Sequence, residues 1–302
     1  MKRLFAVLLA ALLCASPAFA WENGFLTVAD AGLTGEFTAL IPEIVEMVNG
    51  FQQERGHPPV GEADIDLDAM YPYYTGQNYF DPAIDSAGEF LRRIEEQENY
   101  TWVLPLAIGG ERIRVGVTRT RPVRDGVAAV LTAEELAALQ ARVGKWSCTW
   151  AAFGKEPEAD WKAVAQAAAP DADQIVLVNR LDGVVALFAV CIKDGSFGDV
   201  IAVTDAVIPV NAADAAAIAA RSSLRVTSQA IDLRCGERFS YAELQETIGR
   251  LEPDPGLLQI VPRSGVGFRL NDRLHHVGAL IGVPAITMAV AAAAAAWYRR
   301  KK

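Results

Sequence analysis

Apolar and polar residues alternate with two different periodicities along the middle of the chain, one typical of helices and one typical of strands. Residues 37–53 place apolar side chains at a helical recurrence, which predicts an amphipathic helix, and residues 86–98 predict a second, shorter one. Residues 101–108 and 112–118 instead read as two strands on either side of a glycine pair, which predicts a β-hairpin. Pro105 has no amide donor, so its strand is predicted to lie at a sheet edge or bulge.

Helix-opening residues mark three more predicted helices. Thr132 with Glu135 forms one candidate capping box, Ser240 with Glu243 forms another, and Asn211 is a candidate N-cap. The remaining predicted elements are a helix over residues 157–169 and strands over residues 175–178, 184–192, 200–207 and 224–233. Hairpins followed by helices predict an α+β fold of hairpin-plus-helix layers, without the strict strand-helix alternation of a doubly wound sheet.

The first 20 residues have the composition of a secretory signal peptide. Lys2 and Arg3 precede an apolar run over residues 4–13, and small residues occupy positions 18 and 20. Cleavage is therefore predicted before Trp21. An uncleaved anchor is the weaker interpretation because ten apolar residues rise only about 15 Å as a helix. Lipidation at Cys14 is disfavoured because the preceding residue is leucine.

The C-terminal end predicts one transmembrane helix. Residues 277–298 contain no charge, and 22 helical residues would rise about 33 Å. The four cations of residues 299–302 follow at once, which places this tail in the cytoplasm and the bulk of the chain outside it. A buried helix of a soluble domain is the alternative. Gly278 and Gly282 have the spacing of a helix-dimer face, although small residues are common in such spans.

The region between these ends is strongly acidic. The chain has a formal charge of −9, but two cations lie in residues 1–20 and four in residues 299–302, so residues 21–276 carry −15. A field of this sign disfavours nucleic acid as a partner. Its length suits one large or two ordinary domains, and the sequence predicts two α+β regions, residues 21–154 and 155–276.

Two groups of residues are candidate ligand contacts. Arginines crowd one short segment, and those proposed to contact a ligand are Arg112, Arg114, Arg119 and Arg121. They are suited to an anionic envelope polymer or to lipid head groups, and the alternative is that they pair with acids on neighbouring strands. Tyr73 and Tyr74 lie in an aromatic stretch that would either stack on sugar rings or seal a core edge.

Tests for catalytic and metal-binding motifs fail. The sequence contains no G-x-S-x-G, S-x-x-K or H-E-x-x-H motif, and before residue 275 its one histidine is His57, in a loop-like segment. Acids at positions 64, 66 and 68 suggest a calcium loop. That motif requires glycine at its sixth position and a carboxylate at its twelfth, and this sequence has Ala69 and Thr75 there. The three acids are therefore assigned to the solvent-exposed face of a strand. No metal or cofactor is predicted.

Three cysteines remain after cleavage of the signal. Cys191 lies in an apolar strand and is interpreted as a buried small hydrophobe. In an oxidising compartment this leaves Cys148 and Cys235 as the predicted disulfide.

Together these observations predict a bacterial single-pass membrane protein of the cell envelope. Its extracytoplasmic region is expected to bind a polymer or protein partner without catalysis. Two alternatives stay open: an anchored hydrolase that uses only carboxylates, as glycosidases do, and an accessory subunit of a membrane complex.

Overall fold

The computed structural model describes residues 24–108, 110–123, 131–154, 160–179, 186–227, 230–251 and 268–270. The predicted signal peptide and the predicted span both lie outside these residues. Within the described part of the chain, no helix has the length and apolarity that crossing a bilayer requires.

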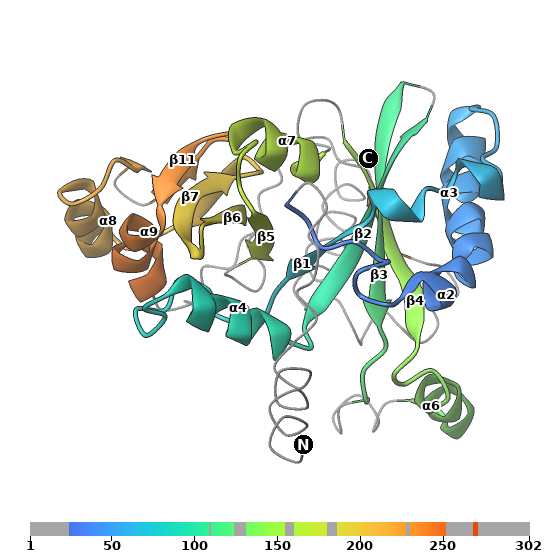
Figure 1. Ribbon diagram of the computed structural model, residues 1–302. Coiled ribbons are helices and arrows are strands. Elements are labelled where there is room, and N and C mark those ends of the chain that lie inside the picture. Colours follow the sequence, from blue (N-terminus) through green and yellow to red (C-terminus); the bar gives the residue numbers. More distant parts are fainter. Residues whose placement is uncertain are drawn as a thin grey trace, which may run out of the picture.

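A nine-stranded mixed sheet forms the centre of the molecule (Figure 1). Its strands in spatial order are β11 (Arg238–Ser240), β7 (Ser196–Ala202), β6 (Leu187–Lys193), β5 (Gln174–Asn179), β1 (Tyr71–Tyr74), β2 (Tyr100–Ile108), β3 (Glu111–Arg119), β4 (Trp146–Gly154) and β12 (Phe268–Leu270). All neighbours pair antiparallel except β1 and β5, where Tyr73 lies opposite Leu177 in a parallel pair. A smaller sheet has the order β8 (Ala206–Pro209), β10 (Ala230–Leu233) and β9 (Arg225–Val226).

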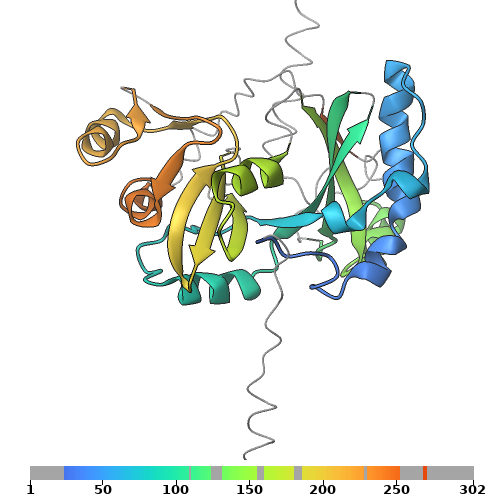
Figure 2. The same cartoon turned by 45° about the horizontal axis from the view of Figure 1, so that its top comes forward.

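The helices of the described residues are α2 (Thr34–Thr38), α3 (Ile41–Arg55), α4 (Ala87–Glu95), α6 (Ala133–Gln140), α7 (Trp161–Ala168), α8 (Ala212–Ala219) and α9 (Tyr241–Glu246). Helices cover one face of the large sheet at both of its ends (Figure 1). Helices α2 and α3 pack with β2, β3 and β4, whereas α4 and α9 belong to a core cluster with β5, β6 and β7. Helix α8 joins this cluster and contacts β9 of the smaller sheet. Helix α7 packs on the opposite face, near the middle of the sheet (Figure 2).

Strand alternation assigns each side chain to one of these faces. On β5, Val176 and Val178 point toward α4, while Ile175 and Leu177 point toward α7. On β2, Trp102 and its even-numbered neighbours contact the α3 side, whereas Val103 belongs to the α7 side. Both faces of the central strands are therefore buried, which explains why these strands read as almost continuous apolar runs.

The α+β prediction is confirmed at the level of a mixed chain with a large mixed sheet and helices. The hairpin of β2 and β3 is confirmed, as is the Thr132–Glu135 capping box, in which Glu135 N donates to Thr132 Oγ1 at 3.2 Å and Thr132 N donates to Glu135 Oε2 at 2.8 Å. Pro105 lies on an interior strand, but β1 pairs only as far as Val103, so β2 has a single neighbour at the proline.

The N-terminal region departs from the predicted elements at two places. The aromatic residues Tyr71–Tyr74 form the central strand β1, which was not among the predicted strands. The acidic run at residues 64–68 forms two short 3₁₀ turns, η1 (Glu62–Asp64) and η2 (Leu67–Ala69), and Asp66 caps the second by accepting from Asp68 N at 3.0 Å. A carboxylate that satisfies a nearby amide favours a turn over a strand.

The boundary predicted at residue 154 does not coincide with a break in the sheet. Strand β1 precedes it and β5 follows it, yet the two are hydrogen-bonded neighbours. Helix α4 also precedes residue 154, and its Phe90 packs with Phe197 and Tyr241 from beyond it. Residues on both sides of the predicted boundary therefore share one sheet and one core.

An ion-pair network on α4 gives the fold a testable acid sensitivity. Hydrogen bonds from Arg92 and then Arg93 lower the pKa of Glu89 from 4.5 to about 2. Because the pKa is depressed in the folded state, the stabilisation is present above about pH 4.5 and is lost as the pH falls toward 2. We expect Glu89→Gln to lower the thermal unfolding midpoint at pH 6. Near pH 2 the midpoints of the variant and the parent should be equal. Exposed Glu98→Gln is the control, and parallel curves for E89Q and the parent would contradict the assignment.

Candidate functional site

Three of the predicted ligand residues come together beside α7. Tyr73 on β1 and Arg114 on β3 both contact Trp161, the first residue of α7: the Tyr73 and Trp161 rings lie 5.7 Å apart, and the Arg114 guanidinium lies 4.2 Å from the Trp161 ring centre. Arg112 lies two residues along β3 from Arg114, on the same face of the sheet. Sequence reasoning found the arginines and Tyr73 but missed Trp161, which joins them.

Asp160 completes this group and shows what Arg112 does there. One carboxylate oxygen of Asp160 accepts from Ala163 N at 2.9 Å and so caps α7, while the other accepts from Arg112 Nη1 at 3.3 Å. Arg114 is 8% exposed, so its charge is held within the protein by stacking on Trp161. The alternative in which the arginines pair within the protein therefore describes Arg112 well.

The tyrosines next to this group are packed side chains. Burial raises the pKa of Tyr71 and of Tyr73, and Arg114 opposes both shifts. Tyr74 points to the other face, where it is 6% exposed and lies 5.5 Å from the Tyr100 ring. Burial is also the main reason that the pKa of Tyr74 is raised. The aromatic stretch thus seals the core on both faces of β1, and Tyr74 presents no ring to solvent.

Arg119 and Arg121 lie at the opposite end of β3 from Arg112. Both are exposed, and Arg119 donates from Nε to the carbonyl of Gly144 at 2.7 Å. The structure therefore divides the predicted arginine group into two parts. Arg112 and Arg114 serve the packing of α7, whereas Arg119 and Arg121 face solvent.

The predicted disulfide is wrong in this fold. Cys148 is fully buried on β4 against the α3 side, whereas the Cys235 sulfur lies 3.5 Å from the carbonyl of Val203, which follows β7. Strand β7 is six strands from β4 in the sheet, or about 29 Å at the usual strand spacing. A disulfide requires Cα atoms within about 7 Å. Cys191 is buried as predicted, and burial raises its pKa to about 12.

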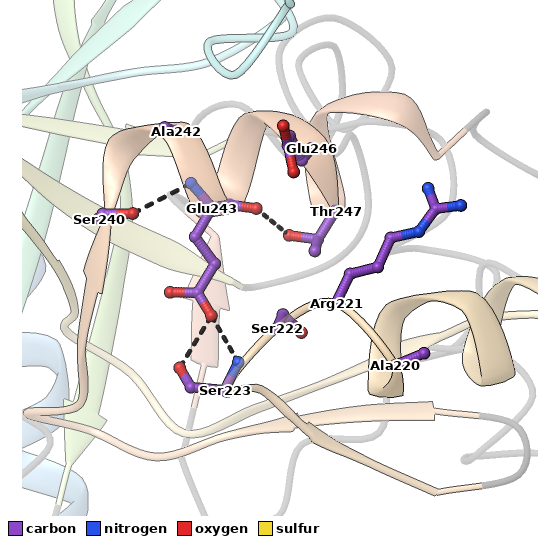
Figure 3. Close-up of a pocket in the computed structure, with 9 residues that line it drawn as sticks. All are labelled: Ala220, Arg221, Ser222, Ser223, Ser240, Ala242, Glu243, Glu246 and Thr247. Atoms are coloured by element: carbon purple, nitrogen blue, oxygen red, sulfur yellow. Dashed lines mark hydrogen bonds between the residues drawn. The ribbon is translucent and has the colours of Figure 1, made fainter.

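A surface pocket of about 460 Å³ lies between α9 and the turn that follows α8 (Figure 3). Ser222, Ser223, Ser240 and Thr247 supply hydroxyl groups, Glu243 and Glu246 supply carboxylates, and Arg221 lies at its rim. A second pocket of about 300 Å³ shares Ser240 and Ala242 with it and is lined by Phe197 and Tyr241, whose rings stack at 3.6 Å.

The polar groups of the larger pocket are engaged in local structure (Figure 3). Glu243 Oε1 accepts from Ser223 N at 2.6 Å and from Ser223 Oγ at 2.8 Å, so the expected capping box at Ser240 is only half formed. Thr247 Oγ1 donates to the Glu243 carbonyl at 2.6 Å. Ser222 Oγ donates to the carbonyl of Ile218 at 2.9 Å. Glu243 thereby ties the turn after α8 to α9.

No group of three or more potential metal ligands occurs among the residues that the structure describes. Comparison of the chain with protein-family models, with curated proteins and with solved structures finds no match.

Proposed function

We propose that this chain is an exported protein held in the membrane by residues 277–298, with its folded region outside the cytoplasm acting as a non-catalytic binding module of the cell envelope. The observation that carries the proposal is the partition of charge at the C-terminus. A run of 22 uncharged residues ends in four consecutive cations, while residues 21–276 carry −15. Apolar residues favour the bilayer, and the cations stay on the cytoplasmic side.

The larger pocket does not favour the alternative of carboxylate-dependent hydrolysis. Hydrolysis of a glycosidic bond needs two acids that face each other across the substrate, one of them available as a proton donor. At this pocket the carboxylate of Glu243 is occupied by the amide and hydroxyl of Ser223. Glu246 lies three residues further along the same short helix and is exposed. This arrangement stabilises α9 and leaves no facing pair at the pocket.

Membrane retention of the full chain tests the anchor. We expect the parent protein to stay in the membrane fraction after alkaline carbonate extraction and Ile281→Lys/Ile286→Lys to leave it. Lysine at the centre of a span costs about 3 kcal/mol and isoleucine favours insertion, so Ile286→Lys near the centre, together with Ile281→Lys closer to one end, disfavours insertion by at least about 3 kcal/mol. Val207→Lys/Ala220→Lys adds the same charge at exposed sites and should be retained. Release of the parent by carbonate would refute the anchor.

A further inference from the structure

Four cations gather where β3 ends and β4 begins, next to α6 at the lower right of Figure 1. They are Arg119, Arg121, Arg142 and Lys145, and we call this group the basic end. Backbone hydrogen bonds join the two segments that carry it: Thr120 N donates to Lys145 O at 2.9 Å, and Gly144 N donates to Thr120 O at 2.8 Å. The bond from Arg119 to Gly144 O adds a third link, so the cations lie on one ordered part of the fold.

The charges of the basic end are largely uncompensated. Arg142 lies 3.7 Å from Glu43, but no carboxylate in the described part of the chain forms an ion pair with Arg119, Arg121 or Lys145, all three of which are exposed. Several exposed arginines elsewhere are paired, as in the contacts of Arg92 with Glu89 and of Arg238 with Asp199. Arg221 and Arg250, at the α9 end, are exposed and form no ion pair within the described part of the chain. Three exposed cations without an ion pair among the described residues therefore lie together at the basic end, within a region whose formal charge is −15.

Strand β12 runs toward this same end. Phe268 pairs with Ala152 and Leu270 with Trp150, so the strand proceeds along β4 in the direction of Trp146. Trp146 is four residues from Trp150, or about 14 Å along a strand. Six residues, 271–276, separate β12 from the predicted span and reach about 20 Å when extended. The basic end therefore lies within reach of the point where the predicted anchor begins.

We propose, on the basis of the membrane anchorage proposed above, that the basic end docks on anionic phospholipid head groups beside the anchor. An acidic body tethered to an anionic bilayer is repelled by it, and screening limits this field to about 8 Å at physiological salt. Only charged groups at the membrane-facing end therefore interact strongly with the charge of the bilayer surface. Each Lys or Arg placed there contributes about 1 kcal/mol, so three exposed cations set which end of the body faces the lipid.

Energy transfer from the protein to head-group-labelled lipid tests this orientation. Residues 21–302 carrying Cys235→Ser are incorporated into nanodiscs, with a donor dye on Ala141→Cys beside the basic end or on Ala220→Cys at the α8 end. Both positions are exposed, and Cys148 and Cys191 are buried. In discs that contain phosphatidylglycerol, we expect much stronger transfer from position 141 than from position 220. In phosphatidylcholine discs this difference should shrink.

Charge reversal separates docking from simple tethering. Arg121→Glu/Lys145→Glu should lower the ratio of docked to undocked molecules by at least about tenfold in phosphatidylglycerol discs, since two favourable contacts are lost. Arg221→Glu/Arg250→Glu makes the same charge change at exposed sites at the α9 end and should leave transfer from position 141 unchanged. Equal transfer from both dyes, or indifference to R121E/K145E, would overturn this inference alone. A chain that does not join the nanodisc would overturn the proposed anchorage instead.

Discussion

Gly249→Ala is expected to lower the free energy of unfolding by about 3 kcal/mol. A Cβ atom at this position would lie 2.0 Å from the carbonyl oxygen of Phe80, closer than atoms can approach. The obstacle is backbone, so no side-chain rotation relieves it, and forced overpacking of this kind costs about 1 to 3 kcal/mol or more. Gly249 lies in the 3₁₀ turn η3 (Ile248–Arg250), whose carbonyl at Gly249 also accepts from Asn78 Nδ2 at 2.7 Å.

Urea unfolding followed by tryptophan fluorescence measures this loss. Gly88→Ala is the matched control, because it makes the same substitution in α4 where no heavy atom lies within 4 Å of the added carbon. Alanine is a better helix former than glycine, so G88A should keep or raise the stability by up to about 1 kcal/mol. Equal stability of G249A and G88A would show that η3 does not press against the Phe80 loop as described.

Gly116→Ala should also destabilise the protein, by about 2 kcal/mol, through a contact on the α7 side of the sheet. The added Cβ would lie 2.1 Å from Cε2 of Trp150, which crosses over the glycine from β4. The indole can rotate away from the new methyl group, and the cost of that movement is the loss of its packing against the core cluster that contains Tyr71 and Trp161.

A double-mutant cycle with Trp150→Ala identifies the cause of this loss. If the steric contact is responsible, G116A should cost much less in the W150A background, which corresponds to a coupling of at least about 1 kcal/mol. Additive losses would instead show that Gly116 is required for the backbone itself, at the register shift between Gly116 and Val117.

Short-range features of the fold were predictable because their physical causes are local. Ser86, Thr132, Asn211 and Ser240 all accept from the amide three residues on, as N-cap residues do. The hairpin of β2 and β3 likewise depends on neighbouring residues. These elements could be identified without knowledge of the rest of the chain.

The long-range features were not predictable from local pattern. The segment of Tyr71–Tyr74 becomes the central strand only because β2 and β5 pair with its two edges, and β5 lies about a hundred residues away in the chain. Strand β4 was missed for the same reason, since β3 and β12 enclose it. The roles of Asp160 and Trp161 depend on the docking of α7 against β1 and β3, which no spacing in the sequence encodes.

The orientation of the chain in the membrane is tested most directly by protease treatment of cells that carry an epitope tag after Lys302. We expect externally added protease to remove the folded region and to leave a short tagged fragment, which stays protected until the membrane is opened with detergent. A chain that stays whole while other surface proteins are digested, or a tag that is lost before lysis, would contradict this orientation.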